Sequence, residues 1–314
     1  MAITAKDVQK LREMTGCGMM DCKKALTEAD GDFDKAIEYL REKGLAASAK
    51  KAGRIAAEGM AYAAVVDGVG VVVEVNAETD FVAKNEKFVE FVKGVAATVA
   101  ANKPADLDAL MECTYVGTNL TVTQQQQEMV LVIGENIKVR RFHFFTEGVS
   151  VPYIHAGGKI GVLVNLEVEG VDATECGKDV AMQIAALNPR FWDKTQVTED
   201  VLAEEKKIML AQMDNDPKMA NKPEQVKVKI VEGKLNKFYT ENCLLQQEFV
   251  KDNEFTVEKY IASSAKALGG KVTFKDAVRF EKGEGIEKKQ ENFAEEIAKQ
   301  LAPISVGSCT IQID

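Results

Sequence analysis

The spacing of apolar residues predicts three short helices at the start of the chain. Apolar positions recur every three or four residues through this region, which is the period of an amphipathic helix. The first helix begins after Thr4, a residue type that caps helices, and ends at the glycine-containing turn of residues 15–18. The second covers about residues 19–29. The third is predicted to stop at Gly44, and residues 46–54 read as a basic linker.

The pattern then changes to runs rich in valine, which predict strands. Residues 60–66 and 69–75 flank Asp67-Gly68, a dipeptide typical of tight hairpin turns. The elements predicted to follow are one long helix, two shorter helices and a strand, at about residues 79–101, 106–113, 121–134 and 137–145.

A similar order of elements returns later in the chain, which is the most informative structural feature of the sequence. Residues 161–164 are a glycine followed by aliphatic residues, like residues 70–73. A helix is expected at about residues 173–187. Residues 268–280 then resemble residues 133–145. The sequence therefore predicts an α+β core made of two similar halves, and not one alternating sheet.

The second half carries an insertion that reads as two helices. Residues 198–213 are helical in pattern, a polar turn with prolines follows, and a second helix runs from about residue 223 towards 235. This predicts an antiparallel helical hairpin projecting from the body, with two ordinary packed core helices as the alternative. Residues 285–301 are amphipathic and predict a C-terminal helix. We expect four units, at residues 1–53, 54–146, 147–283 and 284–314. The third unit contains the hairpin insertion, at about residues 194–240.

Composition narrows the kind of partner. The net charge of −9 argues against general nucleic-acid binding, which needs a basic surface. Apolar runs stay well short of the roughly 18 residues that a membrane helix needs, and the N-terminus lacks the apolar core of a signal peptide. We therefore expect a cytoplasmic protein whose partners are other proteins, not membranes.

The residues that carry chemistry are sparse. The chain has no Gly-x-x-x-x-Gly-Lys-Ser/Thr loop, so we expect no nucleotide binding of its own, and the glycines at 157–161 are expected to form a hairpin turn. Two histidines and scattered carboxylates form no catalytic motif, so we expect no enzymatic activity and no cofactor. The cysteines are expected to be free thiols without a metal, because they are scattered, at positions 17, 22, 113, 176, 243 and 309.

Four segments of the chain resemble the elongation factor Ts family. They read LREMTGCGMMDCKKAL at residues 11–26, ETDFVAKN at 78–85, IVEGKL at 230–235 and GEGIEK at 283–288. The similarity extends over about residues 2–301.

The resemblance implies both a layout and an activity. The layout is an N-terminal bundle like a ubiquitin-associated (UBA) domain, a duplicated core, a helical hairpin and a C-terminal helix. The activity is exchange of GDP on the GTPase elongation factor Tu during peptide elongation. The alternative function is a non-catalytic scaffold that binds partners through its UBA-like bundle.

The segment around Phe81 is the first candidate for partner binding. Thr79 is a good helix cap, which would place Asp80 and Phe81 in an exposed first turn. From the pattern alone, core packing is favoured, because Phe81 lies seven residues before Phe88. However, the second half has no Thr-Asp-Phe at the corresponding place, so the fold does not require it. The resemblance implies that Asp80 and Phe81, flanked by Thr79 and Val82, enter the partner near its magnesium site.

The N-terminal bundle supplies the second group of candidates. Adjacent residues on a helix point about 100° apart, so Met19 and Met20 cannot both face the bundle centre, and methionine is an adaptable contact residue. The resemblance implies that these two residues, with Leu11 and Arg12, dock on the nucleotide-binding domain of the partner. The resemblance also implies that His155 contacts another part of the partner. The alternatives are core packing for Leu11, a solvated helix position for Arg12 and a hairpin-turn position for His155.

Overall fold

Three helices form the beginning of the chain in the computed structural model, which describes residues 3–216, 218–219 and 222–287. The helices are α1 (Ala5–Thr15), α2 (Met19–Glu28) and α3 (Phe33–Lys51). Thr4 caps α1, because its hydroxyl oxygen accepts a hydrogen bond from the backbone N–H of Asp7 at 3.3 Å. The expected three-helix bundle is present, and its apolar side chains form a small core of their own.

The predicted end of the third helix at Gly44 is wrong. Helix α3 continues through Gly44 to Lys51, so most of the expected basic linker is helical. Gly44 is buried where α3 packs against α7 (Val122–Ile133), and a Cβ atom there would lie 3.3 Å from the carbonyl oxygen of Gln127. The glycine allows two helices to approach closely and does not terminate one. As a result, α3 runs without interruption from the bundle to its contact with α7.

A larger side chain at Gly44 is expected to destabilise the protein. Gly44→Leu should lower the free energy of unfolding by about 1–3 kcal/mol, because the added atoms overpack the contact between α3 and α7. Gly233→Leu is the matched control, since Gly233 is also inside a helix but has open space around its Cβ position. Chemical denaturation of the two variants measures the difference. Equal stability would contradict the close approach as the reason for this glycine.

The core contains two antiparallel sheets of three strands each. The first has the order β1 (Glu58–Val66), β2 (Val69–Ala77) and β3 (Lys138–Phe145), and the second has β4 (Val149–His155), β5 (Ile160–Glu169) and β8 (Lys271–Glu281). Both central strands shift register against their third strand, between Glu74 and Val75 in the first sheet and between Asn165 and Leu166 in the second. This shared irregularity supports the predicted duplication.

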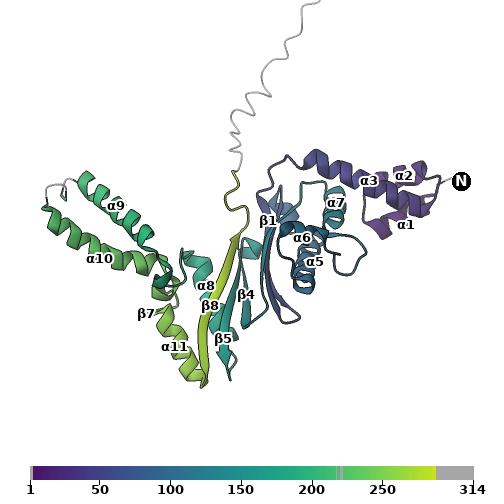
Figure 1. The fold of residues 1–314 in the computed structure, drawn as a ribbon. Helices are drawn as coiled ribbons and strands as arrows, with labels where there is room; N and C mark the ends of the chain where they lie inside the picture. The colour runs from purple at the N-terminus through teal and green to yellow at the C-terminus, as the bar shows by residue number, and fades with distance from the viewer. Residues whose placement is uncertain (1–2, 217, 220–221, 288–314) are drawn as a thin grey trace, which may run out of the picture.

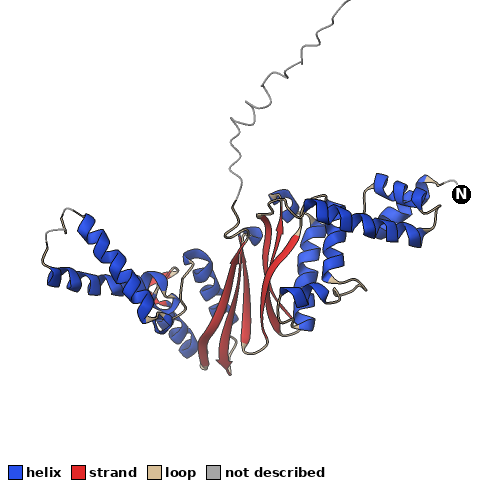
Figure 2. Cartoon of the chain, turned by 45° about the horizontal axis from the view of Figure 1, so that its top comes forward, coloured by secondary structure: helices blue, strands red, loops and turns tan. Residues whose placement is uncertain are grey.

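The two sheets face each other in the middle of the molecule, and helices cover their outer sides (Figure 2). Helices α5 (Glu86–Asn102), α6 (Leu107–Glu112) and α7 pack on the first sheet, while α8 (Thr174–Leu187) and α11 (Val257–Leu268) pack on the second. Between the sheets lies a thin apolar layer, formed by Ala61, Ala63, Val72, Leu163 and Phe280. The α+β class with a duplicated core is therefore confirmed.

The long helix predicted at residues 79–101 is in fact two helices. The short helix α4 (Asp80–Ala83) ends at Lys84, and α5 begins at Glu86. Asn85 separates them, because its side-chain oxygen accepts a hydrogen bond from the backbone N–H of Lys87 at 3.0 Å and caps α5. Phe81 and Phe88 are therefore not on one helix face.

The insertion forms an antiparallel pair of helices that projects from the body (Figure 1). Helix α9 (Glu199–Asn215) and helix α10 (Glu224–Asn242) are joined by an ion pair of 2.5 Å between Asp214 and Lys227. Figure 1 shows this hairpin and the N-terminal bundle at opposite ends of the molecule, with the sheets between them.

Several elements differ from the sequence prediction or were not predicted. Helix α10 runs to Asn242, beyond the expected end near residue 235. The strands β6 (Glu248–Phe249) and β7 (Asp252–Thr256) and the helix α11 were missed. Short 3₁₀ turns occur at Ala156–Gly158, Lys194–Gln196 and Leu244–Gln246. The predicted C-terminal helix lies, from residue 288 onward, outside the described residues.

Candidate protein-interaction surface

Phe81 is the most exposed large apolar side chain of the described residues. Its relative exposure is 80%, whereas Phe88 is fully buried in the core beneath α5. Asp80, beside it, is also exposed and lies 3.9 Å from Lys84. Val82, in contrast, is buried in the first core and does not present its side chain to solvent. The short helix α4 thus uses Val82 as an anchor and displays Asp80 and Phe81.

Thr79 holds this turn in place, but not by the predicted cap. Thr79 occupies the position before α4, yet its side chain accepts no hydrogen bond from the helix. Its hydroxyl instead donates to Oε1 of Glu135 at 2.7 Å. The backbone N–H groups of Glu78 and Thr79 both donate to Oε2 of the same carboxylate at 3.0 Å. Glu135, which the sequence analysis missed, therefore fixes the approach to the Phe81 turn.

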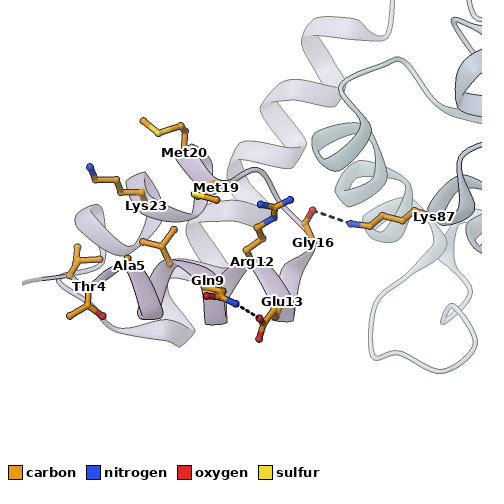
Figure 3. A pocket seen from close by; sticks show the side chains of 12 residues that line it. Thr4, Ala5, Gln9, Arg12, Glu13, Gly16, Met19, Met20, Lys23 and Lys87 are labelled. Atoms are coloured by element: carbon orange, nitrogen blue, oxygen red, sulfur yellow. Dashed lines mark hydrogen bonds between the residues drawn. The ribbon is translucent and has the colours of Figure 1, made fainter.

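Met19 and Met20 are both exposed, at 57% and 74%, and line a groove on the N-terminal bundle (Figure 3). The groove has a volume of about 990 Å³, and Arg12 and Lys23 also line it. Leu11 is fully buried in the bundle core, so it supports α1 and offers no side chain to a partner. The surface combines flexible thioether side chains with positive charge, which suits an apolar surface edged with carboxylates.

Lys87 connects this groove to the Phe81 turn. Its Nζ donates to the carbonyl oxygen of Gly16 at 3.2 Å, as Figure 3 shows. Both residues line the groove of Met19 and Met20, and both also line a second depression of about 320 Å³ that includes Phe81. The structure therefore brings Arg12, Met19, Met20 and Phe81 to neighbouring parts of one surface.

His155 lies apart from these two depressions. It ends β4 in the second half of the core, is exposed, and its Nδ1 lies 3.1 Å from the hydroxyl of Tyr153. It therefore forms a separate candidate contact, at the hairpin turn before Ile160.

The described residues show neither a metal centre nor a membrane span. No three or more of their His, Cys, Asp and Glu side chains lie close enough together to hold a metal ion. None of the helices in these residues has both the length and the apolar character needed to cross a bilayer.

Comparison with known proteins identifies close relatives along nearly the whole chain. The family model for Elongation factor TS matches residues 78–284. Elongation factor Ts from Clostridium novyi (strain NT) is 48% identical over 306 residues, which is 95% of this chain and 99% of that protein. The proteins of the same name from Clostridium tetani and Syntrophotalea carbinolica are 49% and 47% identical, with the same coverage of both chains.

Proposed function

The chain belongs to the elongation factor Ts family, and on that premise we propose that it promotes the release of GDP from elongation factor Tu. The observation that carries this proposal is the displayed Phe81. A largely exposed aromatic ring on a turn that is anchored by Glu135 suits insertion into a partner. Since the turn is already ordered, little conformational entropy is lost on binding. The predicted units at residues 1–53 and 54–146 would supply these contacts together.

An exchange factor must bind the nucleotide-free partner better than the nucleotide-bound partner, and the weakening is reciprocal. A thousandfold acceleration of release requires about 4 kcal/mol of barrier lowering. Buried aromatic residues at interfaces contribute about 2–4 kcal/mol each, so Phe81 and a few further contacts are sufficient. Asp80 adds a carboxylate beside the ring. Near bound phosphates and Mg²⁺, that charge would repel the phosphates and compete for the metal.

The decisive experiment measures the loss of labelled GDP from elongation factor Tu. Substoichiometric amounts of this protein should accelerate the loss over many turnovers. A scaffold that only binds the partner through its bundle would not accelerate it. Calorimetry on the protein alone should show no saturable GDP binding, because the sequence has no phosphate-binding loop. A micromolar GDP site on the isolated protein would contradict the proposal.

The methionine groove is expected to supply affinity. Replacing Met19 and Met20 together by alanine should weaken binding to nucleotide-free elongation factor Tu at least about tenfold, which corresponds to about 1.4 kcal/mol. Met14→Ala is the control, since Met14 is similarly exposed, at 56%, but does not line the groove of Met19 and Met20. Surface plasmon resonance measures both dissociation constants. Equal constants for the double variant and the control would exclude this groove as a docking site.

A further inference from the structure

The N-terminal bundle is attached to the core on its α3 side by packing. Leu131 and Val132 of α7 contact the apolar cluster of the bundle. The guanidinium of Arg41 on α3 lies 3.5 Å from the carboxylate of Glu128 on α7. Because these contacts lie along α3, they oppose separation of the bundle from the core. They oppose rotation of the bundle about the axis of α3 less strongly.

A second attachment of the bundle comes from α5, where Lys87 crosses to the turn that follows α1. Its ammonium group donates to the carbonyl oxygen of Gly16. Depressions of about 320 and 360 Å³ flank this bridge, and Lys87 and Gly16 line both of them. The bundle and α5 are therefore separated by open space on either side of the lysine.

The chemistry of this bridge favours a stable contact. Gly16 is the residue that ends α1, where the carbonyl groups carry the negative end of the helix dipole. A lysine ammonium group placed there is favoured by that dipole and by the hydrogen bond together. The contact is made by α5 and not by α7, so it adds a separate attachment that opposes rotation of the bundle around α3.

We propose that Lys87 is a positioning residue that sets the angle of the N-terminal bundle relative to the Phe81 turn. With this angle fixed, Met19 and Met20 on the bundle and Phe81 on the core meet one partner in one orientation. The expected effect on the rate of GDP release rests on the proposed function, whereas the expected effect on the angle of the bundle does not.

The kinetic test uses Lys87→Met, which keeps the apolar stem and removes the donor. The rate of GDP release at saturating protein should fall about fivefold, the factor that corresponds to one net hydrogen bond. The concentration for half-maximal rate should change much less, because the bundle and Phe81 each keep their own contacts. Lys87→Arg should restore the rate, since a guanidinium also donates to Gly16. Lys93→Met, at an exposed lysine of the same helix, should leave the rate unchanged.

The geometric test measures the distance between the bundle and the core in the protein alone. Spin labels are attached to genetically encoded non-canonical amino acids, so that the native cysteines stay unlabelled. The labels replace Glu28 of α2 and Glu112 of α6, which are both exposed. The distance distribution should be narrow in the original protein and in Lys87→Arg. In Lys87→Met it should be broader.

The outcomes separate this inference from the proposed function. An unchanged distance distribution in Lys87→Met would overturn the positioning role, even with slower exchange, because Lys87 would then act by touching the partner. If Lys87→Met promotes GDP release at an unchanged rate while Phe81→Ala promotes it more slowly, the positioning role of Lys87 would also be overturned. The proposed exchange function would then remain intact. A broadened distribution, in a protein that never accelerates GDP release, would support the role of Lys87 and overturn the function.

Discussion

Phe81→Ala is expected to slow GDP release from elongation factor Tu by one to two orders of magnitude while leaving folding nearly unchanged. The rate loss corresponds to about 1.4–2.8 kcal/mol of selective binding to the nucleotide-free partner. Because the ring is 80% exposed, its removal creates no cavity. The free energy of unfolding should therefore change by no more than about 0.5 kcal/mol. A melting curve and an exchange rate on the same preparation measure both quantities.

Phe88→Ala is the matched control for this prediction. Phe88 is fully buried in the first core, so its truncation should lower the free energy of unfolding by about 3–5 kcal/mol. Its folded fraction should still promote exchange at the normal specific rate. Asp80→Ala should resemble Phe81→Ala with a smaller rate loss, since it removes a charge but little apolar area. A large loss of stability in Phe81→Ala, with normal exchange by the folded protein, would exclude insertion of Phe81 into the partner as the mechanism.

Glu74→Ala is expected to lower the free energy of unfolding by about 3–5 kcal/mol, because it removes one partner from a buried charged network. The Glu74 side chain is fully buried on β2. Its carboxylate accepts hydrogen bonds from Arg140 at 2.9 Å and Arg141 at 2.5 Å. It also accepts from the side chain of Asn76 at 3.0 Å and from the backbone N–H of Gly283 at 2.8 Å. Without the carboxylate, the donors remain buried or half-buried with fewer partners.

Glu167→Ala provides the comparison for Glu74→Ala. Glu167 lies on the central strand of the other sheet and pairs with Lys275 at 3.1 Å, but both side chains are about half exposed. Exposed ion pairs contribute only about 0–1 kcal/mol, so this variant should be nearly as stable as the original protein. Denaturant titration of both variants gives the two values. Similar losses would show that burial of the Glu74 network does not determine its contribution.

The Glu74 network also predicts how stability depends on pH. Burial alone would raise the pKa of Glu74, but the hydrogen bonds from Gly283, Asn76, Arg140 and Arg141 outweigh it and lower the pKa below its ordinary value of 4.5. A carboxyl group whose pKa is lower in the folded state contributes its full stabilisation above the unfolded pKa. That stabilisation is lost as the pH falls from about 4.5 through the folded pKa. The difference in unfolding free energy between the original protein and Glu74→Gln should therefore narrow below pH 4.5.

Local sequence signals were sufficient for the elements whose ends depend on local chemistry. Asp67-Gly68 predicted the first hairpin, and both residues adopt the positive φ angles, 49° and 80°, that its tight turn requires. The repeated order of elements predicted two similar halves, which appear as two sheets with matching register shifts. Helix α11 was missed although Thr256 caps it and Val257, Ile261 and Ala265 supply an apolar face.

Features that depend on contacts between residues far apart in the chain could not be predicted from local sequence patterns. The role of Gly44 depends on Gln127, which lies on a helix far along the chain, so the sequence alone favoured the wrong role of a helix stop. For Phe81, the ambiguity came from assuming one helix through Asn85. The interruption was detectable, since asparagine is a common capping residue, but the anchoring of the turn by Glu135 was not.

The contact between Glu74 and Gly283 links positions 209 residues apart in the chain, and this separation has a consequence for biosynthesis. At about 5–20 residues per second, a ribosome needs about 10–40 seconds to add the intervening residues. During that interval Glu74 lacks its backbone donor, and the apolar layer between the sheets can gain Leu163 of β5 but still lacks Phe280 of β8. The nascent core therefore passes through a period in which the layer between its sheets is incomplete and Glu74 lacks one of its partners. It closes only after β8 has left the ribosome.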